Sequence, residues 1–169
     1  MNVAETERLR LRFFTEDDAA FIFELLNEPS WIRYIGDKGI RTHEDALRYL
    51  RNGPIAMYER VGFGLYAVEL KATGDVIGMC GLIKRETLAD VDLGFAFLPR
   101  FWRNGYAFEA ASAALSHGRH ELGLQRIVAI LSPDNDRSSH LLEKLGFLRE
   151  GTIALAPDDE ALALYAYAE

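Results

Sequence analysis

The segment from Val91 to Leu131 constrains the fold more than any other part of the sequence. Apolar residues alternate from Val91 to Phe97, which is the period of a half-buried strand. From Gly105 to Gly123 small and apolar residues recur at helical spacing, and Arg126–Leu131 is then apolar enough for a strand buried on both faces. A strand, a helix and a second strand in this order need a crossover, so we expect the two strands to be parallel neighbours in one sheet.

The rest of the chain adds strands and capped helices in the order β-α-α-β-β-β-α-β-α-β-β. A chain of 169 residues fits one domain, so we expect a single domain over residues 1–169. The expected fold class is α/β, with a mixed, mostly antiparallel central sheet flanked by helices. The remaining expected strands span residues 8–14, 63–70, 76–84, 152–156 and 161–167, and the remaining helices span 15–26, 42–52 and 138–145.

Composition excludes several classes of protein. The 26 acidic and 19 basic residues give a net charge of -7, which argues against a general nucleic-acid binder but is compatible with a cationic substrate such as an amine.

The one cysteine, Cys80, excludes an internal disulfide, and its apolar surroundings predict a buried core residue. His117 and His120 have a spacing that could bind a metal, but no third ligand is evident, so we expect no metal. No stretch resembles a membrane span or a signal peptide, so we expect a cytoplasmic protein without membrane partners.

The stretch from Leu98 to Ala107 could bind phosphate. A strand ends there, a short basic loop follows, and a long helix begins. The first amides of a helix have no internal partners and lie at the positive end of its dipole, so they bind anions. Gly105 would let an anion approach the main chain, and Arg100 and Arg103 add positive charge. The same spacing also fits a plain strand–helix connection with exposed arginines.

Two motifs together resemble a known family. Residues 102–110 read Trp-Arg-Asn-Gly-Tyr-Ala-Phe-Glu-Ala, and residues 135–147 contain Asn, then Ser three residues on, then Lys-Leu-Gly-Phe after five more. This pattern resembles the Gcn5-related N-acetyltransferase (GNAT) superfamily, and most of all its ribosomal-protein N-terminal acetyltransferase branch. The order of expected elements matches over the whole chain. Two positions depart from the branch: Arg103 replaces a glycine, and Phe108 replaces a small hydroxyl residue.

The resemblance implies acetyl-CoA as cosubstrate, held between two splayed parallel strands at residues 91–98 and 126–131. By similarity, strand main chain would hold the pantetheine arm like an added strand, and the amides of residues 103–107 would hold the pyrophosphate. The resemblance assigns acetyl-CoA binding to Phe97, Leu98, Arg100, Arg103, Asn104, Gly105, Tyr106, Ala107, Asn135, Ser138 and Lys144.

The implied reaction is direct transfer of an acetyl group from the thioester to an amine. The ammonium must first lose a proton, and an acidic side chain, directly or through water, is the usual base. Asp92 matches the acidic position of the branch's strand motif. Asp90 and Glu150 are alternatives, and each of the three could instead be a solvated or substrate-orienting carboxylate.

The developing oxyanion and the leaving thiolate also need stabilisation. The resemblance places a backbone N–H near Phe97 at the oxyanion and gives Asn135 a role in the site. Many GNAT enzymes have a tyrosine acid at the position of Leu142, so Ser138 is the candidate partner for the thiolate. Ser138 could also cap the helix that follows, a role that Asn135 or Asp136 could fill.

The acceptor is less defined. Trp31 and Tyr34 lie in a segment that would border the acceptor site by resemblance, although they could simply close a loop on the core. The branch favours a protein N-terminal amine over a small-molecule amine. The alternatives are a non-catalytic acyl-CoA-binding regulatory module and a structural protein with a vestigial fold. The expected strand at the C-terminus could pair through its edge in a homodimer.

Overall fold

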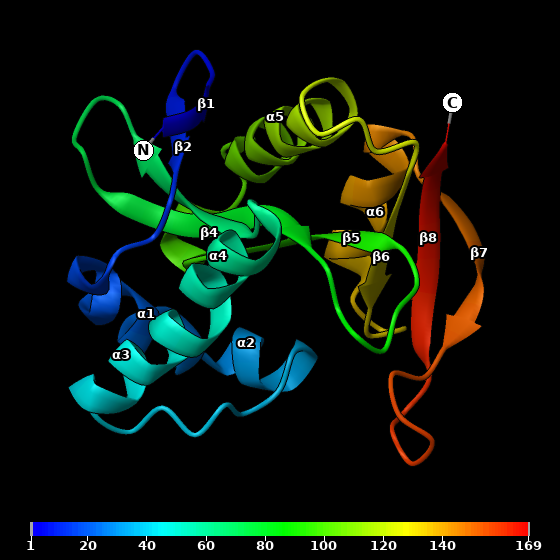
Figure 1. Cartoon of the computed structure of the whole chain (residues 1–169), viewed down its shortest axis with the longest axis horizontal. Coiled ribbons are helices and arrows are strands. Elements are labelled where there is room, and N and C mark those ends of the chain that lie inside the picture. Colours follow the sequence, from blue (N-terminus) through cyan, green and yellow to red (C-terminus); the bar gives the residue numbers. More distant parts are fainter. Residues whose placement is uncertain (1, 169) are drawn as a thin grey trace.

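The structure, a computed structural model, describes residues 2–168 and is built around an eight-stranded sheet in the order β1-β2-β3-β4-β5-β6-β8-β7 (Figure 1). Every neighbouring pair is antiparallel except β5 and β6. The strands are β1 Asn2–Glu5, β2 Leu9–Arg12, β3 Leu65–Leu70, β4 Val76–Ile83, β5 Val91–Phe97, β6 Arg126–Leu131, β7 Leu148–Ile153 and β8 Leu162–Ala168.

Helices cover both faces of this sheet. In Figure 1, α5 lies above the sheet and α1 to α4 gather below it. No described helix is long and apolar enough to cross a membrane. The α-helices are α1 Ala19–Leu26, α2 Pro29–Tyr34, α3 His43–Leu50, α4 Ala56–Val61, α5 Tyr106–His120 and α6 Asp136–Leu145; the 3-10 turns are η1 Glu16–Asp18 and η3 Pro99–Phe101, and Arg51–Ile55 (η2) is π-helical.

The parallel pair is short. β5 and β6 are in register only at Val91↔Ile127 and Asp92↔Val128, whereas β5 pairs with β4 all the way from Ile83↔Asp92 to Gly78↔Phe97. Beyond Asp92 the two parallel strands therefore diverge. The expected crossover, the mixed sheet and the splayed strand pair are all confirmed.

Alternation along the central strands divides the core into two parts. Cys80 and its neighbours on one face pack with α5, where Ala110, Ala111 and Ala114 are fully buried and let the helix lie close to the sheet. Met79, on the other face, packs with the buried residues of α1 and α3. The expectation that Cys80 is a buried core residue is confirmed.

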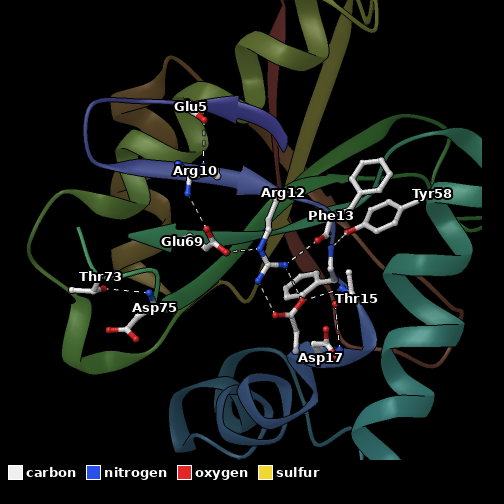
Figure 2. Close-up of polar contacts among 12 residues, drawn as sticks. Glu5, Arg10, Arg12, Phe13, Thr15, Asp17, Tyr58, Glu69, Thr73 and Asp75 are labelled. Atoms are coloured by element: carbon white, nitrogen blue, oxygen red, sulfur yellow. Dashed lines mark hydrogen bonds and ion pairs between the residues drawn. The ribbon is translucent and has the colours of Figure 1, made fainter. Parts of the chain in front are cut away.

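A chain of ion pairs fixes the N-terminal strands and the start of the helical layer (Figure 2). Arg12 on β2 donates to Glu69 on β3 at 2.6 Å and to both carboxylate oxygens of Asp18 at 2.9 Å. Asp18 in turn accepts from the amide of Thr15, which completes a capping box at the start of η1. On the other face, Glu109 of α5 accepts from the main chain and side chain of Arg8. These contacts hold α1 and α5 against the same edge of the sheet.

The structure corrects several expected boundaries in the first half of the chain. β1, α2 and α4 were not expected, and the helix that opens at Thr42 does not stop at Gly53 and Pro54. It continues through the π-helical turn Arg51–Ile55 into α4. Proline cannot donate a main-chain hydrogen bond, and the wider π turn accommodates it where a regular α-helical turn would be broken.

The C-terminal hairpin is present, but its first strand is β7, Leu148–Ile153, rather than residues 152–156. β7 is an edge strand with little buried surface, and Leu148 is 75% exposed, so its apolar pattern is weak. β8 lies between β6 and β7. The suggested pairing of the C-terminal strand through its edge in a homodimer is therefore not open to β8, because β6 and β7 flank it on both sides.

Candidate active site

Two adjoining cavities open where β5 and β6 diverge. The larger, of about 790 Å³, extends to the start of α5 and along α6. The smaller, of about 400 Å³, extends along β5 on the face covered by the first helices. Both fall within the usual size range of ligand pockets. The cavities share seven lining residues, which mark where two bound molecules would meet: Trp31, Tyr34, Ile35, Phe95, Ala96, Asn135 and Ser138.

The start of α5 faces the larger cavity. Gly105 precedes the helix at φ +80° and offers no capping side chain. The first amides of α5 belong to Tyr106, Ala107 and Phe108, and all three residues line the cavity. These amides have no intrahelical partners, so they are available to an anion.

Cations reinforce this end of the larger cavity. Arg103, Arg137 and Lys144 line it, with Arg137 4.2 Å above the ring of Trp102 and Lys144 4.5 Å above the ring of Phe108. Arg103, at the position where the branch resemblance implies a glycine, has φ +67°, a left-handed conformation that glycine adopts without strain. The loop therefore has the left-handed conformation that glycine would adopt here, and it also places a cation at the larger cavity.

The main chain of β5 faces the gap at alternate residues. The amide of Leu98 donates to the carbonyl of Ile77 at 3.0 Å, which directs Leu98 toward β4. Because antiparallel pairing alternates, the polar groups of Phe95 and Phe97 point to the other side, toward the splayed β6. The carbonyl of Phe97 accepts from the Trp102 indole at 2.9 Å. Leu98 is buried and lines neither cavity, so Phe95 rather than Leu98 accompanies Phe97 at the gap.

Two expected contacts lie elsewhere. Arg100 pairs with Glu24 of α1 at 2.6 Å, and the side chain of Asn104 donates to the carbonyls of Phe101 and Trp102. Neither Arg100 nor Asn104 lines a cavity. Arg100 therefore ties the loop to α1, and Asn104 holds the turn before α5.

The start of α6 lies at the junction of the cavities. Asn135 caps the helix by accepting from the amide of Ser138 at 3.3 Å, so Ser138 is not the cap. The cap uses only the side-chain oxygen of Asn135 and leaves its amide nitrogen for a ligand. Leu142, one turn further on, is fully buried and offers no proton.

One of the three candidate base residues faces a cavity. Asp92 lines the smaller cavity, its side chain is 2% exposed, and it accepts from Arg85 Nε at 3.1 Å. Burial raises the pKa of Asp92 and outweighs the opposing effect of Arg85. Asp90 and Glu150 both pair with Arg126 outside either cavity, which leaves Asp92 as the candidate base.

The aromatic residues expected at the acceptor site lie on α2. Trp31 and Tyr34 line both cavities. The indole N–H of Trp31 is buried and has no hydrogen-bond partner among the described residues. The guanidinium of Arg33 lies 4.8 Å above the ring of Tyr34 and pairs with Asp134 before α6, so it links α2 to the other side of the gap.

Comparison with known proteins decides the family. The profile of the acetyltransferase (GNAT) domain matches residues 8–148. The chain belongs to the GNAT acetyltransferases. An uncharacterized N-acetyltransferase of Bacillus subtilis, YoaA, is 34% identical over 154 residues, which cover 89% of this chain and 85% of that protein.

Solved structures agree on the fold. An acetyltransferase of the GNAT family from Bacillus anthracis has a TM-score of 0.81 at 27% identity, covering 99% of this chain and 98% of that one. RimL, a ribosomal L7/L12 alpha-N-protein acetyltransferase solved in complex with coenzyme A, has a TM-score of 0.83 at 17% identity, covering 99% and 98%. At that identity RimL shows the fold alone.

This GNAT chain also has lining residues that its sequence did not reveal. Phe95 and Arg137 stand inside or beside the family motifs and could have been found from the strand alternation and the helix start. Lys38, Tyr49 and Arg85 come from a loop, a helix and the segment that follows β4, and no local pattern connects them. Burial raises the pKa of Tyr49 to about 12, so its hydroxyl stays protonated and can donate.

Proposed function

We propose that this GNAT chain transfers the acetyl group of acetyl-CoA to a primary amine. The observation that carries the proposal is the pair of cavities that meet at Phe95, Ala96, Asn135 and Ser138, between two strands that diverge. One cavity ends in unpartnered helix amides and cations, and the other contains a buried carboxylate. A phosphate-bearing donor and an amine acceptor would meet at the shared residues.

The residues present fit acetyl-CoA. The amides of Tyr106, Ala107 and Phe108, with Arg103 and Lys144, supply the N–H groups and positive charge that a pyrophosphate needs. These cations gather in a chain whose net charge is -7, so they are a local feature and not a general one. The main chain at Phe95 and Phe97 supplies strand-like hydrogen bonds for an extended amide arm.

When bound, acetyl-CoA supplies an acetyl thioester at the junction of the cavities. There the neutral amine nitrogen would form a bond to the carbonyl carbon, the carbon–sulfur bond would break, and the second proton on nitrogen would pass to the departing sulfur, which would leave as the thiol of coenzyme A. Asp92 accepts the proton that the ammonium loses, and Ser138 donates a hydrogen bond to the departing sulfur. Asp92 lies three residues from Phe95, about 10 Å along a strand, so the proton reaches it through bridging water.

The preferred acceptor is a protein N-terminal amine, with a small-molecule amine as the second candidate. The resemblance to the ribosomal-protein branch supports the first. The second is favoured by the size of the smaller cavity, about 400 Å³, which is that of a small ligand pocket.

The test is a calorimetric titration with acetyl-CoA of the wild type, Gly105→Glu and Gly105→Ala. Both variants place a side chain at φ +80°, and only the first places a carboxylate at the helix amides. We expect micromolar binding, roughly -8 kcal/mol, in the wild type, weaker binding in Gly105→Ala and none in Gly105→Glu. Equal binding by the two variants would remove the start of α5 from the site.

Turnover separates the enzyme from a non-catalytic acyl-CoA-binding module. Release of free thiol is followed with acetyl-CoA and a panel of peptide and small amines, in the wild type and in Asp92→Asn. Amine-dependent release that falls in the variant supports transfer. Tight acetyl-CoA binding without any amine-dependent release would support the module, and no binding would refute the proposal.

A further inference from the structure

At the polar end of the smaller cavity, the proposed reaction uses Asp92 but gives no role to Arg85. Arg85, just beyond the end of β4, donates to Asp92 through Nε alone. A guanidinium has five N–H donors, so the terminal nitrogens keep four of them. Among the described residues no hydrogen bond of these terminal nitrogens is present, and Arg85 lines the cavity with its side chain 35% exposed.

The charges around this end are unequal. Lys38 and Arg85 line the smaller cavity, and Asp92 is the one acidic residue that lines it in the described part of the chain. Asp92 offsets one of the two cations. The cavity therefore has a net positive lining, in a chain that is strongly acidic overall. The protonated hydroxyl of Tyr49 is a further donor at this cavity.

An apolar stretch separates this end from the junction with the larger cavity. It is formed by Leu65 and Met79 of the sheet, by Ile130 of β6, by Pro54 of η2 and by Met57 of α4. Along β5 the distance from Phe95, at the junction, to Asp92 is three residues, about 10 Å. An acceptor that lies along one side of the cavity, beside the water that links its amine to Asp92, presents its amine at the junction, an apolar body in the middle, and a polar group near Arg85.

We propose that the acceptor is a primary amine that carries a carboxylate about 10 Å away across an apolar body, and that Arg85 selects it by binding that carboxylate. The inference rests on the proposed acetyl transfer and names the acceptor class for it. Such a carboxylate can come from a small amino acid with a long apolar spacer or from an acidic side chain at the third residue of a peptide. Arg85 is a specificity-determining residue here.

The experiment compares matched acceptors that differ in this one group. 8-Aminooctanoate is tested against 8-aminooctanamide, and a peptide beginning Ala-Leu-Glu against one beginning Ala-Leu-Gln. For each pair, the ratio of kcat/KM for acid over amide is measured by thiol release. We expect a ratio of about ten or more in at least one pair, because a charge-assisted hydrogen bond is replaced by a neutral one. The pair that shows it identifies the source of the carboxylate.

Variants locate the effect. Lys38→Gln and Arg85→Gln should lower the ratio toward one, Arg85→Lys should keep most of it, and Arg48→Gln, an exposed arginine paired with Asp45 away from both cavities, should leave it unchanged. The ratio is internal to each variant, so a general loss of activity or stability does not change its meaning. Calorimetric titration of octanoate and octanamide into the coenzyme A complex gives a readout independent of turnover.

The outcomes separate this inference from the proposed function. Ratios near one in the wild type overturn the inference, and so does an acid-to-amide ratio that Arg85→Gln leaves unchanged. Acetyl-CoA binding without turnover of any acid probe also overturns it. A failure to bind acetyl-CoA, measured first, or binding without thiol release by any amine of the panel counts against the proposed function, and the inference fails with it.

Discussion

The loop before α5 makes a prediction in which stability and cofactor binding change in opposite directions. Arg103 has φ +67° and lines the larger cavity, at a position where the branch resemblance implies a glycine. Replacing it by glycine removes backbone strain and a cation together. Arg103→Ala removes only the cation, and Arg103→Lys keeps both the cation and the strain. The three variants therefore separate the two effects.

The expected size of the strain effect follows from the backbone. Holding an L residue in the left-handed region costs roughly 1–2 kcal/mol. Glycine removes most of that cost, but it also increases the entropy of the unfolded chain, which lowers stability by about 0.4–1 kcal/mol. The free energy of unfolding of Arg103→Gly should therefore exceed that of Arg103→Ala by about 1 kcal/mol. For a domain of this size this corresponds to a melting temperature about 2–4 °C higher.

The charge effect is measured separately. Loss of a cation beside the helix amides should weaken acetyl-CoA binding by roughly five-fold, about 1 kcal/mol, in both the glycine and alanine variants. Arg103→Lys should bind nearly as well as the wild type. The difference in acetyl-CoA affinity between the wild type and Arg103→Gly should become smaller as the salt concentration rises, because Arg103 is exposed and its charge is screened.

Thermal unfolding and calorimetric titration check the two halves of this reasoning. A glycine variant no more stable than the alanine variant would refute the strain argument. Acetyl-CoA binding equal in all four proteins, at low and at high salt, would refute the placement of the pyrophosphate beside Arg103.

Three further predictions test the fold and the site. Gly81→Ala should lower the free energy of unfolding, measured with denaturant, by about 3 kcal/mol, because the added Cβ would lie 2.2 Å from the carbonyl oxygen of Gly64. Gly53→Ala is the control: a Cβ at Gly53 would have nothing within 4 Å, so this variant should lose no stability. Asn135→Ala should lose about 1 kcal/mol with its helix cap and also weaken acetyl-CoA binding. Because burial raises the pKa of Asp92, the folded protein takes up this proton before the unfolded chain as pH falls, so stability relative to Asp92→Asn should rise as pH falls through the raised pKa.

Each has a result that would contradict it. Equal stability of Gly81→Ala and Gly53→Ala would mean that the backbone around Gly64 can move away from the added Cβ at little energetic cost. Normal acetyl-CoA affinity in Asn135→Ala would reduce that residue to a helix cap. A stability difference between wild type and Asp92→Asn that does not change with pH would show that Asp92 has an ordinary pKa.

Many of the residues that line the larger cavity, the proposed donor half of the site, were named from the sequence because they are continuous in the chain. A strand end, a loop and a helix start follow one another within residues 97–108, so the main-chain groups that face the larger cavity are neighbours in sequence. The sequence alone could not show which residues of β5 direct their main-chain groups toward β4 and which toward the gap. Leu98 and Phe97 are adjacent, but alternation turns one toward β4 and the other toward the gap, and that phase depends on the register with Ile77.

Boundaries were wrong where tertiary contacts override local signals. Gly53 and Pro54 are strong helix-ending residues, yet the chain stays helical because the π turn keeps the segment between α3 and α4 packed over the sheet, with Pro54 buried. β7 had too few buried residues to give a strand pattern and is defined by its pairing with β8.

The residues of the smaller cavity, the proposed acceptor half of the site, are distributed differently along the sequence, and this has a functional consequence. Its lining comes from the loop at Lys38, from Tyr49 on α3, from Arg85 after β4 and from Leu162 at the start of β8, which are far apart in sequence. None of these residues lines the larger cavity. Substitutions among them can therefore change which amine is bound while the helix amides and cations that face the donor stay in place. The acid-to-amide ratio in Arg85 variants should accordingly change without any change in acetyl-CoA affinity, because the two measurements report on cavities that meet only at the splayed strands.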